Sequence, residues 1–377
     1  MLIKNLFPRP EKDTLAMLDR FHATLSKTFP LKGKHREVLH KNVRDLSDSL
    51  TSDRESLKKD YMGDARLLGA YLHYFLPWNL YRMSRLFSGI NPSVRDNGTI
   101  IDLGSGPMTV PLAMWMSMPA LRDRKLTFVC VDRAPKVMNE GRKLFDRIAG
   151  PKAPWRIVTV KGSLGMKLRE KGDLVVAANT LNELNLSARG KQQDPMGKLA
   201  RTLRQYMAEN GRLLLIEPGL RRSGETLSAL RGLLLEQRLS PLAPCTHAGE
   251  CPMTGLGKSP WCHFNFGIEG APGKLMNLTR RARLTKTGLS LSFLYMTEGE
   301  AEHAEAVRVI SEPFPLPEGR GQYGCSDRGL TLLHYPATGP LLYPGQFIVP
   351  QWPEETATDA KSGAVVLPVA IKQGKKK

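Results

Sequence analysis

Four of the five cysteines lie toward the C-terminus and are candidates for binding a metal. Cys245, Cys251 and Cys262 are close in sequence, and Cys325 follows in the segment QYGCSDRG. Thiolates bind structural zinc and iron–sulfur clusters, and both kinds of centre accept four cysteines. The residues therefore predict a tetra-thiolate metal centre that is closed by a distant strand or loop.

The cysteine spacing leaves the identity of the metal open. The pattern Cys-x5-Cys-x10-Cys is not the paired CxxC pattern of a zinc ribbon. Tetrahedral zinc would accept the four thiolates, and His247 or His263 could replace one of them. A [4Fe–4S] cluster also takes four cysteines and tolerates irregular spacing. We expect the two histidines to support the site rather than to bind the metal.

A second candidate site is the glycine-rich turn in IIDLGSGP at 100–107. Asp102 ends a predicted strand, and Gly104 and Gly106 allow positive φ and close approach of a ligand. Asp132 ends the next predicted strand, where its carboxylate could accept both hydroxyls of a ribose. The third glycine of a dinucleotide-binding turn is missing, because residue 109 is threonine.

The turn DLGSGP resembles motif I of the class I S-adenosylmethionine-dependent methyltransferases. The resemblance implies that 104–107 flank the methionine moiety, that Asp132 holds the ribose and that 162–163 lie beside the adenine. The implied cofactor-binding residues are Asp102, Gly104, Ser105, Gly106, Pro107, Asp132, Gly162, Ser163 and Asn179.

Two departures from the methyltransferase pattern concern catalysis. Met108 stands where such enzymes often have a further glycine, and its side chain could narrow the pocket. The segment ANTLNEL at 178–184 lacks the NPPY-type tetrapeptide of amino-methylating enzymes, and no cysteine is placed near it as a nucleophile. The pattern thus predicts cofactor binding, and it identifies no catalytic residue.

Alternating strand and helix patterns should position this turn. Buried-strand patterns recur in TIIDLG, LTFVCVDRA, RIVTVKGS, DLVVAANTL and GRLLLIEP. Such alternation predicts a doubly wound, mostly parallel α/β sheet, with Cys130 as a core residue of the second strand. A helical stretch before it, interrupted at Pro77, carries an aromatic stripe that we expect to pack in the core. The stripe comprises Tyr71, Tyr74, Phe75, Trp78 and Tyr81.

The rest of the chain predicts additions to the α/β sheet: a Cys-rich insertion, further strands and a C-terminal β extension. Residues 239–275 are rich in Pro, Gly and Cys and show no periodic element, and a loop of that length needs a staple such as a metal. LSLSFLYMTE and AVRVISEPF read as strands that complete the sheet. The expected organisation is a helical region at 1–95, an α/β core at 96–238, a Cys-rich cluster-binding insertion at 239–275, last strands and a β extension at 276–353, and a basic disordered tail at 354–377.

The charge favours a polyanionic partner, most simply RNA or DNA. The chain has 55 Lys and Arg against 36 Asp and Glu, a formal net charge of +19. Residues 120–171 carry 14 basic and 5 acidic residues, and residues 270–297 carry no acid. In that second segment, the predicted nucleic-acid contacts are Arg280, Arg281, Arg283 and Lys286. No apolar run is long enough to span a membrane, and the N-terminus lacks a signal-type apolar region, so a cytoplasmic location is expected.

The cysteine segments carry a more specific resemblance. PCTHAGECP and WCHF, with the Tyr-rich AYLHYFLPWNLYRM upstream, resemble the mitochondrial small-ribosomal-subunit methyltransferase-like family over roughly residues 65–350. The resemblance implies a methyltransferase-like fold that carries a [4Fe–4S] cluster and acts on the small ribosomal subunit during assembly. The implied ligands are Cys245, Cys251, Cys262 and Cys325.

Three functions remain open from the sequence. The first is an RNA- and ribosome-directed protein that binds S-adenosylmethionine and the cluster, and either methylates rRNA or assists assembly. The second is a non-catalytic assembly and RNA-binding factor with a degenerate methyltransferase site. The third is a methyltransferase with a zinc staple.

Overall fold

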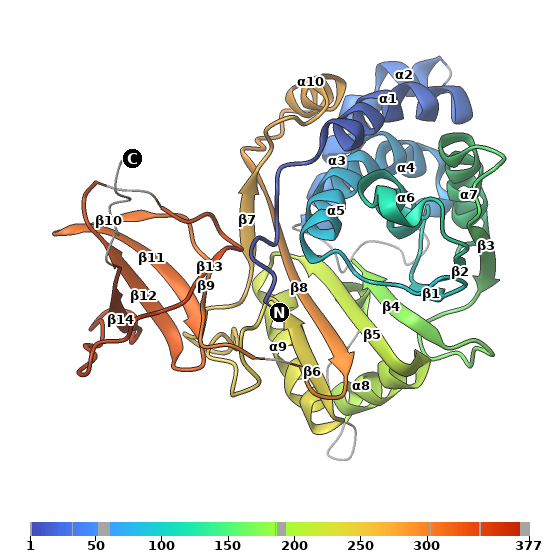
Figure 1. Ribbon diagram of the computed structural model, residues 1–377. Helices are drawn as coiled ribbons and strands as arrows, with labels where there is room; N and C mark the ends of the chain where they lie inside the picture. Colours follow the sequence, from blue (N-terminus) through green and yellow to red (C-terminus); the bar gives the residue numbers. More distant parts are fainter. Residues whose placement is uncertain are drawn as a thin grey trace, which may run out of the picture. The chain divides into compact units, whose positions relative to one another are not determined.

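The structure is a computed structural model that describes residues 2–31, 33–51, 61–184, 186, 194–301, 303–338 and 341–369. Figure 1 labels the helices and strands of the chain, which divides into two compact units. Unit 1 comprises Met1–Phe7, Asn179–Phe266 and Ser290–Lys377, and unit 2 comprises Pro8–Ala178 and Gly267–Leu289.

Unit 2 begins with the predicted helical region. Its helices are α1 Lys12–Thr28, α2 Lys34–Glu37, α3 Leu39–Thr51, α4 Ala65–Ala70 and α5 Leu76–Ile90, with a 3-10 turn at Tyr61–Gly63 and α10 Gly273–Arg281 contributed from later in the chain. Helix α1 buries Leu18, Phe21 and Leu25, whose spacing places them on one face. Among the described helices, none combines the length and the hydropathy needed to span a bilayer.

Helices α4 and α5 join through a π-helical segment, Tyr71–Phe75. The N–H of Leu76 bonds the carbonyl of Tyr71, five residues back, and Pro77 stands in the first turn of α5. Proline is tolerated there because its missing N–H is not needed. The expected interruption at Pro77 is therefore replaced by a widened turn just before it. Tyr74, Trp78 and Tyr81 are buried, which confirms the prediction of core packing for these aromatics.

The sheet of unit 2 is parallel, as predicted. Its strands are β1 Thr99–Leu103, β2 Thr127–Asp132, β3 Arg156–Lys161 and β4 Gly172–Ala178, in the order β3-β2-β1-β4. Helix α6, Thr109–Ser117, follows β1, and α7, Pro135–Ala149, follows β2, with a 3-10 turn at Pro119–Leu121. The central strands are almost wholly apolar because helices cover a parallel sheet on both faces. Cys130 is fully buried in β2, so the prediction that it is a core residue is confirmed.

Unit 1 contains antiparallel strands that the parallel pattern did not predict. Strand β8, Gly288–Glu298, pairs antiparallel with both β5, Met207–Pro218, and β6, Leu239–Ala243. Strand β7, Phe264–Gly267, also pairs with β8, and the helices are α8 Pro195–Tyr206 and α9 Arg221–Glu236, with a 3-10 turn at Leu181–Glu183. The expectation that 239–275 has no regular element is wrong, since β6, β7 and the start of α10 lie there.

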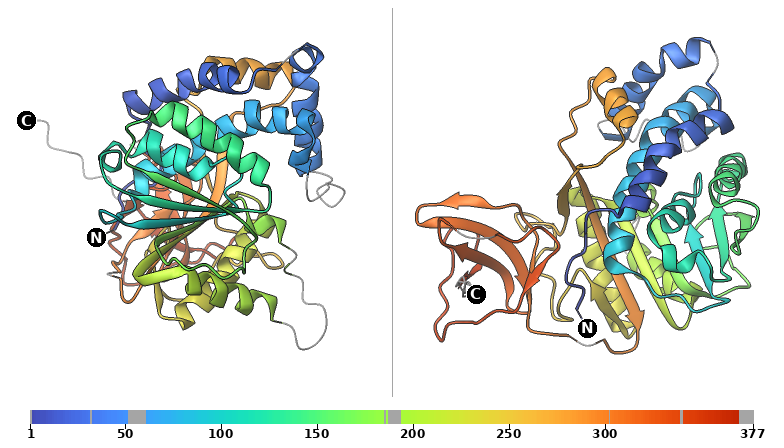
Figure 2. Two further views of the ribbon diagram at one scale, coloured as in Figure 1. Left: turned by 90° about the vertical axis from the view of Figure 1, so that its right-hand side faces the viewer. Right: turned by 45° about the horizontal axis from the view of Figure 1, so that its top comes forward.

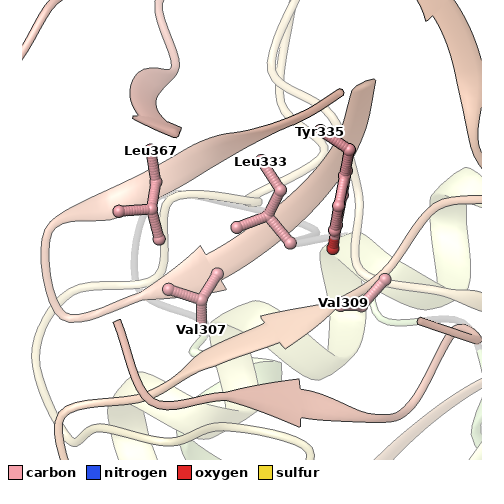
Figure 3. Packing of buried hydrophobic residues seen from close by; sticks show 5 residues of the cluster. All are labelled: Val307, Val309, Leu333, Tyr335 and Leu367. Atoms are coloured by element: carbon pink, nitrogen blue, oxygen red, sulfur yellow. The ribbon is translucent and has the colours of Figure 1, made fainter. Parts of the chain in front are cut away.

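A second, smaller sheet forms the C-terminal part of unit 1 (Figure 2). Its strands are β9 Val307–Val309, β10 Phe314–Leu316, β11 Gly319–Ser326, β12 Gly329–Tyr335, β13 Phe347–Ile348 and β14 Val365–Pro368. Their order is β13-β9-β11-β12-β14, with β10 paired to β11. Val307, Leu333 and Leu367 point toward one another in its core, beside Val309 and Tyr335 (Figure 3).

This second sheet corrects two expectations. AVRVISEPF was expected to complete the large sheet, but β9 pairs with β11 and β13 of the small one. The segment 354–377 was expected to be a disordered tail, but β14 pairs parallel with β12. The last residues of that expected tail, 370–377, lie outside the described part of the chain.

Candidate metal centre and cofactor turn

All four predicted cysteine ligands line one cavity of about 40 Å³ within unit 1. Cys245 follows β6, Cys251 and Cys262 lie in the loop before β7, and Cys325 lies on β11. Other side chains around the cavity are Leu227, Arg231, His247, Met253, Phe264, Phe293, Arg308 and Ile310. Within the described residues, no three His, Cys, Asp or Glu side chains are grouped as ligands of a single metal ion.

Hydrogen bonds to regular elements hold the cysteine segments in place. Thr246 donates its hydroxyl to the carbonyl of Ala306 at 2.9 Å, next to β9. Ser292 on β8 donates to the carbonyl of Cys262 at 2.8 Å. An isolated bridge between Thr254 and Trp261 closes the loop on itself. The loop is therefore anchored at both ends and folded back at its middle.

Arg231 on α9 contacts the cysteine segment directly. Its side chain is buried, its Nε lies 3.3 Å from the sulfur of Cys245, and its Nη2 donates to the carbonyl of His247 at 2.8 Å. Sequence reasoning missed this residue, although a lone arginine inside the apolar helix LSALRGLLLE was a signal. Buried arginines are uncommon unless they are paired.

Arg308 on β9 is the largest fully buried side chain of the described structure and is 1% exposed. It donates to three backbone carbonyls: Nε to Pro244 at 3.1 Å, and Nη1 to Ile3 at 2.7 Å and Gly345 at 2.8 Å. Its Nη2 has no hydrogen-bond partner in the described structure. Burial lowers the pKa of Arg308 to about 10, and the nearby cysteines oppose that shift.

Burial also raises the pKa of the cysteine thiols. Desolvation is the main cause at Cys245, Cys262 and Cys325, and neighbouring cysteine sulfurs raise each pKa further. Four thiolates around one cavity repel one another unless a cation lies among them. The arrangement is thus suited to a metal, which holds its thiol ligands deprotonated.

The two histidines occupy different positions. His247 is buried, and its Nε2 lies 3.6 Å from the sulfur of Cys325. Burial lowers the pKa of His247 to about 4, so its ring is neutral near pH 7. His263 stacks on the ring of Trp261 with centroids 4.7 Å apart. His247 therefore borders the cavity, and His263 packs against the loop.

The glycine-rich turn lies in unit 2, after β1. Asp102 is 1% exposed and accepts a hydrogen bond from the hydroxyl of Ser105 at 2.6 Å through Oδ2. Its Oδ1 has no partner in the described structure. Burial raises the pKa of Asp102 to about 7; the Ser105 hydrogen bond opposes the shift, and the charge of Asp132 adds to it.

Asp132 accepts a backbone hydrogen bond at each carboxylate oxygen, and one of these bonds comes from the turn. Oδ2 accepts from the N–H of Gly106 at 2.9 Å, and Oδ1 accepts from the N–H of Ala134 at 2.8 Å. Each oxygen retains a second lone pair, which leaves capacity for a ribose hydroxyl. The predicted ribose acceptor therefore also fixes the turn to the end of β2.

The turn has the left-handed backbone that its glycines allow. Gly104 has φ 72° and Gly106 has φ 51°, while Met108 is fully buried with φ 61°. A Cβ on Gly141 of α7 would lie 2.3 Å from the carbonyl carbon of Pro107. Only glycine allows α7 to pack so closely on the turn.

The remaining predicted cofactor residues are Gly162, Ser163 and Asn179, and their surroundings differ. The N–H of Gly162 donates to the carbonyl of Asp132 at 3.0 Å, and Met166 packs directly over Gly162. Ser163 is exposed. Asn179 lies in unit 1, where it has φ 54° and donates its N–H to the carbonyl of Ile216 at 2.7 Å.

The predicted nucleic-acid contacts divide into two groups. Arg280, Arg281 and Arg283 are exposed in and just after α10. Lys286 instead lies over the ring of Trp78, with Nζ 5.0 Å from the centroid. Burial, and then the charge of Arg82, lower the pKa of Lys286 to about 8. This lysine is therefore committed to an internal contact.

The strand orders and the turn together define the class of protein. Unit 2 has the order β3-β2-β1-β4 with the DLGSGP turn after β1, and unit 1 has β5-β8-β6 with β8 antiparallel. These are features of a class I S-adenosylmethionine-dependent methyltransferase-like fold, as predicted. The chain belongs to the family described as mitochondrial small ribosomal subunit Rsm22, whose model matches residues 71–314, more than half of its 377 residues.

Solved structures with similarity to the chain include several methyltransferases. A methyltransferase from Pyrococcus furiosus is 12% identical, with a TM-score of 0.32, over 56% of this chain and 80% of its own. A putative class I S-adenosylmethionine-dependent methyltransferase from Listeria monocytogenes is 10% identical, with a TM-score of 0.34, over 78% and 89%. The plantazolicin methyltransferase BpumL, solved with SAH, is 13% identical, with a TM-score of 0.29, over 71% and 100%. A search of curated protein sequences gave no significant match.

Proposed function

We propose that this protein binds S-adenosylmethionine and a [4Fe–4S] cluster and acts on the RNA of the small ribosomal subunit during its assembly. The observation that carries the proposal is the convergence of three cysteines that are close in sequence, and of a distant fourth, on one cavity with two buried arginines. The description of the family supplies the small ribosomal subunit as the partner.

The residues around the cavity fit a thiolate-bound cluster. Arg231 and Arg308 have no carboxylate partner among the described residues, so an anionic centre would balance their charge. Zinc with four thiolates and a [4Fe–4S] cluster with four thiolates are both anionic, so charge alone does not separate them. A cluster is an extended body whose ligands stand farther apart than those of a single ion, and among the described residues no three candidate ligands are grouped closely enough to hold one ion. When bound, it would cross-link the cysteine loop to β11.

The turn after β1 fits the methionine part of S-adenosylmethionine. The free Oδ1 of Asp102 is a buried acceptor, and an ammonium group is a donor of suitable charge. Asp132 retains lone pairs for ribose hydroxyls beside the glycines. The cofactor would supply an activated methyl group, while these residues would bind and orient it.

The basic surface fits RNA. The formal charge of +19 is large, and Arg280, Arg281 and Arg283 are exposed. Arginine binds phosphate through its planar fork of donors, so this cluster suits the backbone of RNA.

Metal analysis of anaerobically purified protein tests the cluster. We expect about four iron and four sulfide per chain, with broad absorption near ~400 nm. Cys245→Ala, Cys251→Ala, Cys262→Ala and Cys325→Ala should each lower iron content, while Cys130→Ala, which alters a buried thiol in unit 2, should not. Colourless protein with stoichiometric zinc would disprove the iron assignment and retain the four ligands.

A second candidate function is RNA binding and subunit assembly without methyl transfer. One observation favours it: the buried Met108 occupies the position in the turn where methyltransferases often have a further glycine. Titration with S-adenosylmethionine separates the candidates. Absence of binding at millimolar cofactor, with RNA binding retained, would select the non-catalytic function.

A further inference from the structure

Arg308 links three chain segments that are far apart in sequence. Its guanidinium donates to Pro244, which precedes the first cysteine ligand, and to Ile3 and Gly345. The N–H of Leu6 donates to the same Gly345 carbonyl at 3.2 Å, and Asn5 forms a bridge with Gln346. One side chain thus joins the cysteine loop, the N-terminal segment 2–7 and the segment 341–349.

The N-terminal segment is also packed by its own side chains. Phe7 stacks on Phe266 with ring centroids 4.7 Å apart and lies 5.3 Å from Phe264, which lines the cavity. A Cβ on Gly345 would lie 2.8 Å from Phe7 Cδ2, so the two segments are in close contact. The segment 2–7 therefore packs beside the cavity as a strap.

The charge of Arg308 requires a compensating anion. Burying a guanidinium is costly unless a counter-charge and hydrogen bonds compensate it. Three carbonyls bind it, yet Nη2 is unpartnered, and no carboxylate pairs with it among the described residues. The cavity that Arg308 lines is bordered by four sulfurs. The compensating anion is therefore best placed among the cysteines.

We propose that Arg308 is the counter-charge of the anionic cluster, and that its carbonyl contacts make closure of the strap 2–7 and of segment 341–349 depend on cluster occupancy. This inference rests on the proposed function. Arg308 acts here as a positioning residue, because it holds backbone segments around the cluster. Removing the cluster leaves the guanidinium buried without its anion and weakens the contacts that it organises.

Hydrogen exchange of the full chain tests the coupling. Removing iron with a chelator should increase exchange in 2–7 and 341–349, in addition to the cysteine loop. In Arg308→Met, both segments should exchange faster even when iron is bound. Release of iron to a chelator should be roughly 30-fold faster than in the wild type, since one partner of a buried charge pair is lost. Arg308→Lys keeps the charge without the planar fork, so iron should be retained better than in Arg308→Met.

Controls separate this inference from the function on which it rests. Arg85→Met removes another buried guanidinium, in unit 2, and should leave iron release unchanged. A wild-type chain that binds neither iron nor sulfide overturns the proposed function and this inference with it. A wild-type chain that holds a cluster, but whose segments 2–7 and 341–349 exchange equally with and without it, overturns this inference alone, even if Arg308→Met does not fold.

Discussion

Asp102 is the residue of the glycine turn whose chemistry is most strongly set by its surroundings. It is buried beside Ser105 and Asp132, and one of its oxygens lacks a partner in the described structure. Burial raises its pKa from 3.8 to about 7. A carboxyl group whose folded-state pKa is raised stabilises the fold below its unfolded pKa and loses that contribution as the pH rises through the folded value. The protein without cofactor should therefore become less stable between about pH 4 and pH 7.

Binding of S-adenosylmethionine should show the opposite pH dependence. Only the ionised Asp102 is a strong acceptor for an ammonium group, so affinity should rise about ten-fold from pH 6 to pH 8. Asp102→Asn should weaken binding and remove this rise, as isothermal titration calorimetry at several pH values would measure. Asp96→Asn, at an exposed position, should keep the rise. A wild-type affinity that is flat over this range contradicts the assigned role.

At the scale of elements, the close packing of α7 on the glycine turn depends on Gly141. An alanine there would place its Cβ against the backbone of Pro107, which cannot move without displacing the turn. We expect Gly141→Ala to destabilise the protein by about 1–3 kcal/mol and to weaken cofactor binding.

Gly232 provides a matched control on another helix. It is exposed in the middle of α9, and a Cβ there would have nothing within 4 Å. Gly232→Ala should stabilise the protein by up to about 1 kcal/mol through helix propensity. Chemical denaturation of both variants would measure the two effects. If both substitutions changed the free energy of unfolding equally and in the same direction, the close contact between Gly141 and Pro107 would not be what determines the effect at Gly141.

The elements also show which parts of the fold could be predicted from the sequence. Strands β1, β2 and β4 are buried apolar runs between helical patterns, so periodicity predicted them. Strand β6 was missed because LSPLA contains proline and leads into an irregular loop, and β14 was missed because it is a short strand that pairs only at long range. Sequence periodicity is local, whereas pairing partners are not.

The grouping of the four cysteines around one cavity could be predicted from the sequence, whereas the residues that surround them could not. Cysteines have few ordinary reasons to cluster in a loop, so their spacing alone indicated a metal. Arg231 and Arg308 were not identified, because the sequence does not reveal that their side chains turn inward. Lys286 was misjudged for the same reason, since its contact with Trp78 depends on tertiary packing.

At the scale of the whole molecule, the formal charge of +19 dominates its expected binding behaviour. Binding to single-stranded RNA should weaken steeply with salt, because each neutralised phosphate releases counter-ions. Replacing Arg280, Arg281 and Arg283 together with Gln should reduce the slope of log K against log salt by about 2. Filter binding across a salt series would measure it.

The control for this measurement is an arginine that is already paired. Arg95 Nε lies 2.6 Å from Asp173 Oδ1. Arg95→Gln therefore removes a positive charge that the Asp173 carboxylate already partly neutralises. Its effect on the slope should be smaller. An unchanged slope in the triple variant would place the RNA contact elsewhere on the surface.

Unit 1 combines residues 1–7 with residues that follow Ala178, so it can be completed only late in the synthesis of the chain. Residues 8–178 of unit 2 emerge from the ribosome as one uninterrupted stretch, and helices and neighbouring parallel strands can form from it early. The contacts from Arg308 to Ile3 and Gly345 require that more than 340 residues have been synthesised. Until then these contacts cannot form, although Cys245, Cys251 and Cys262 have already been synthesised. In the nascent protein, three of the four cysteines are therefore synthesised well before the fourth.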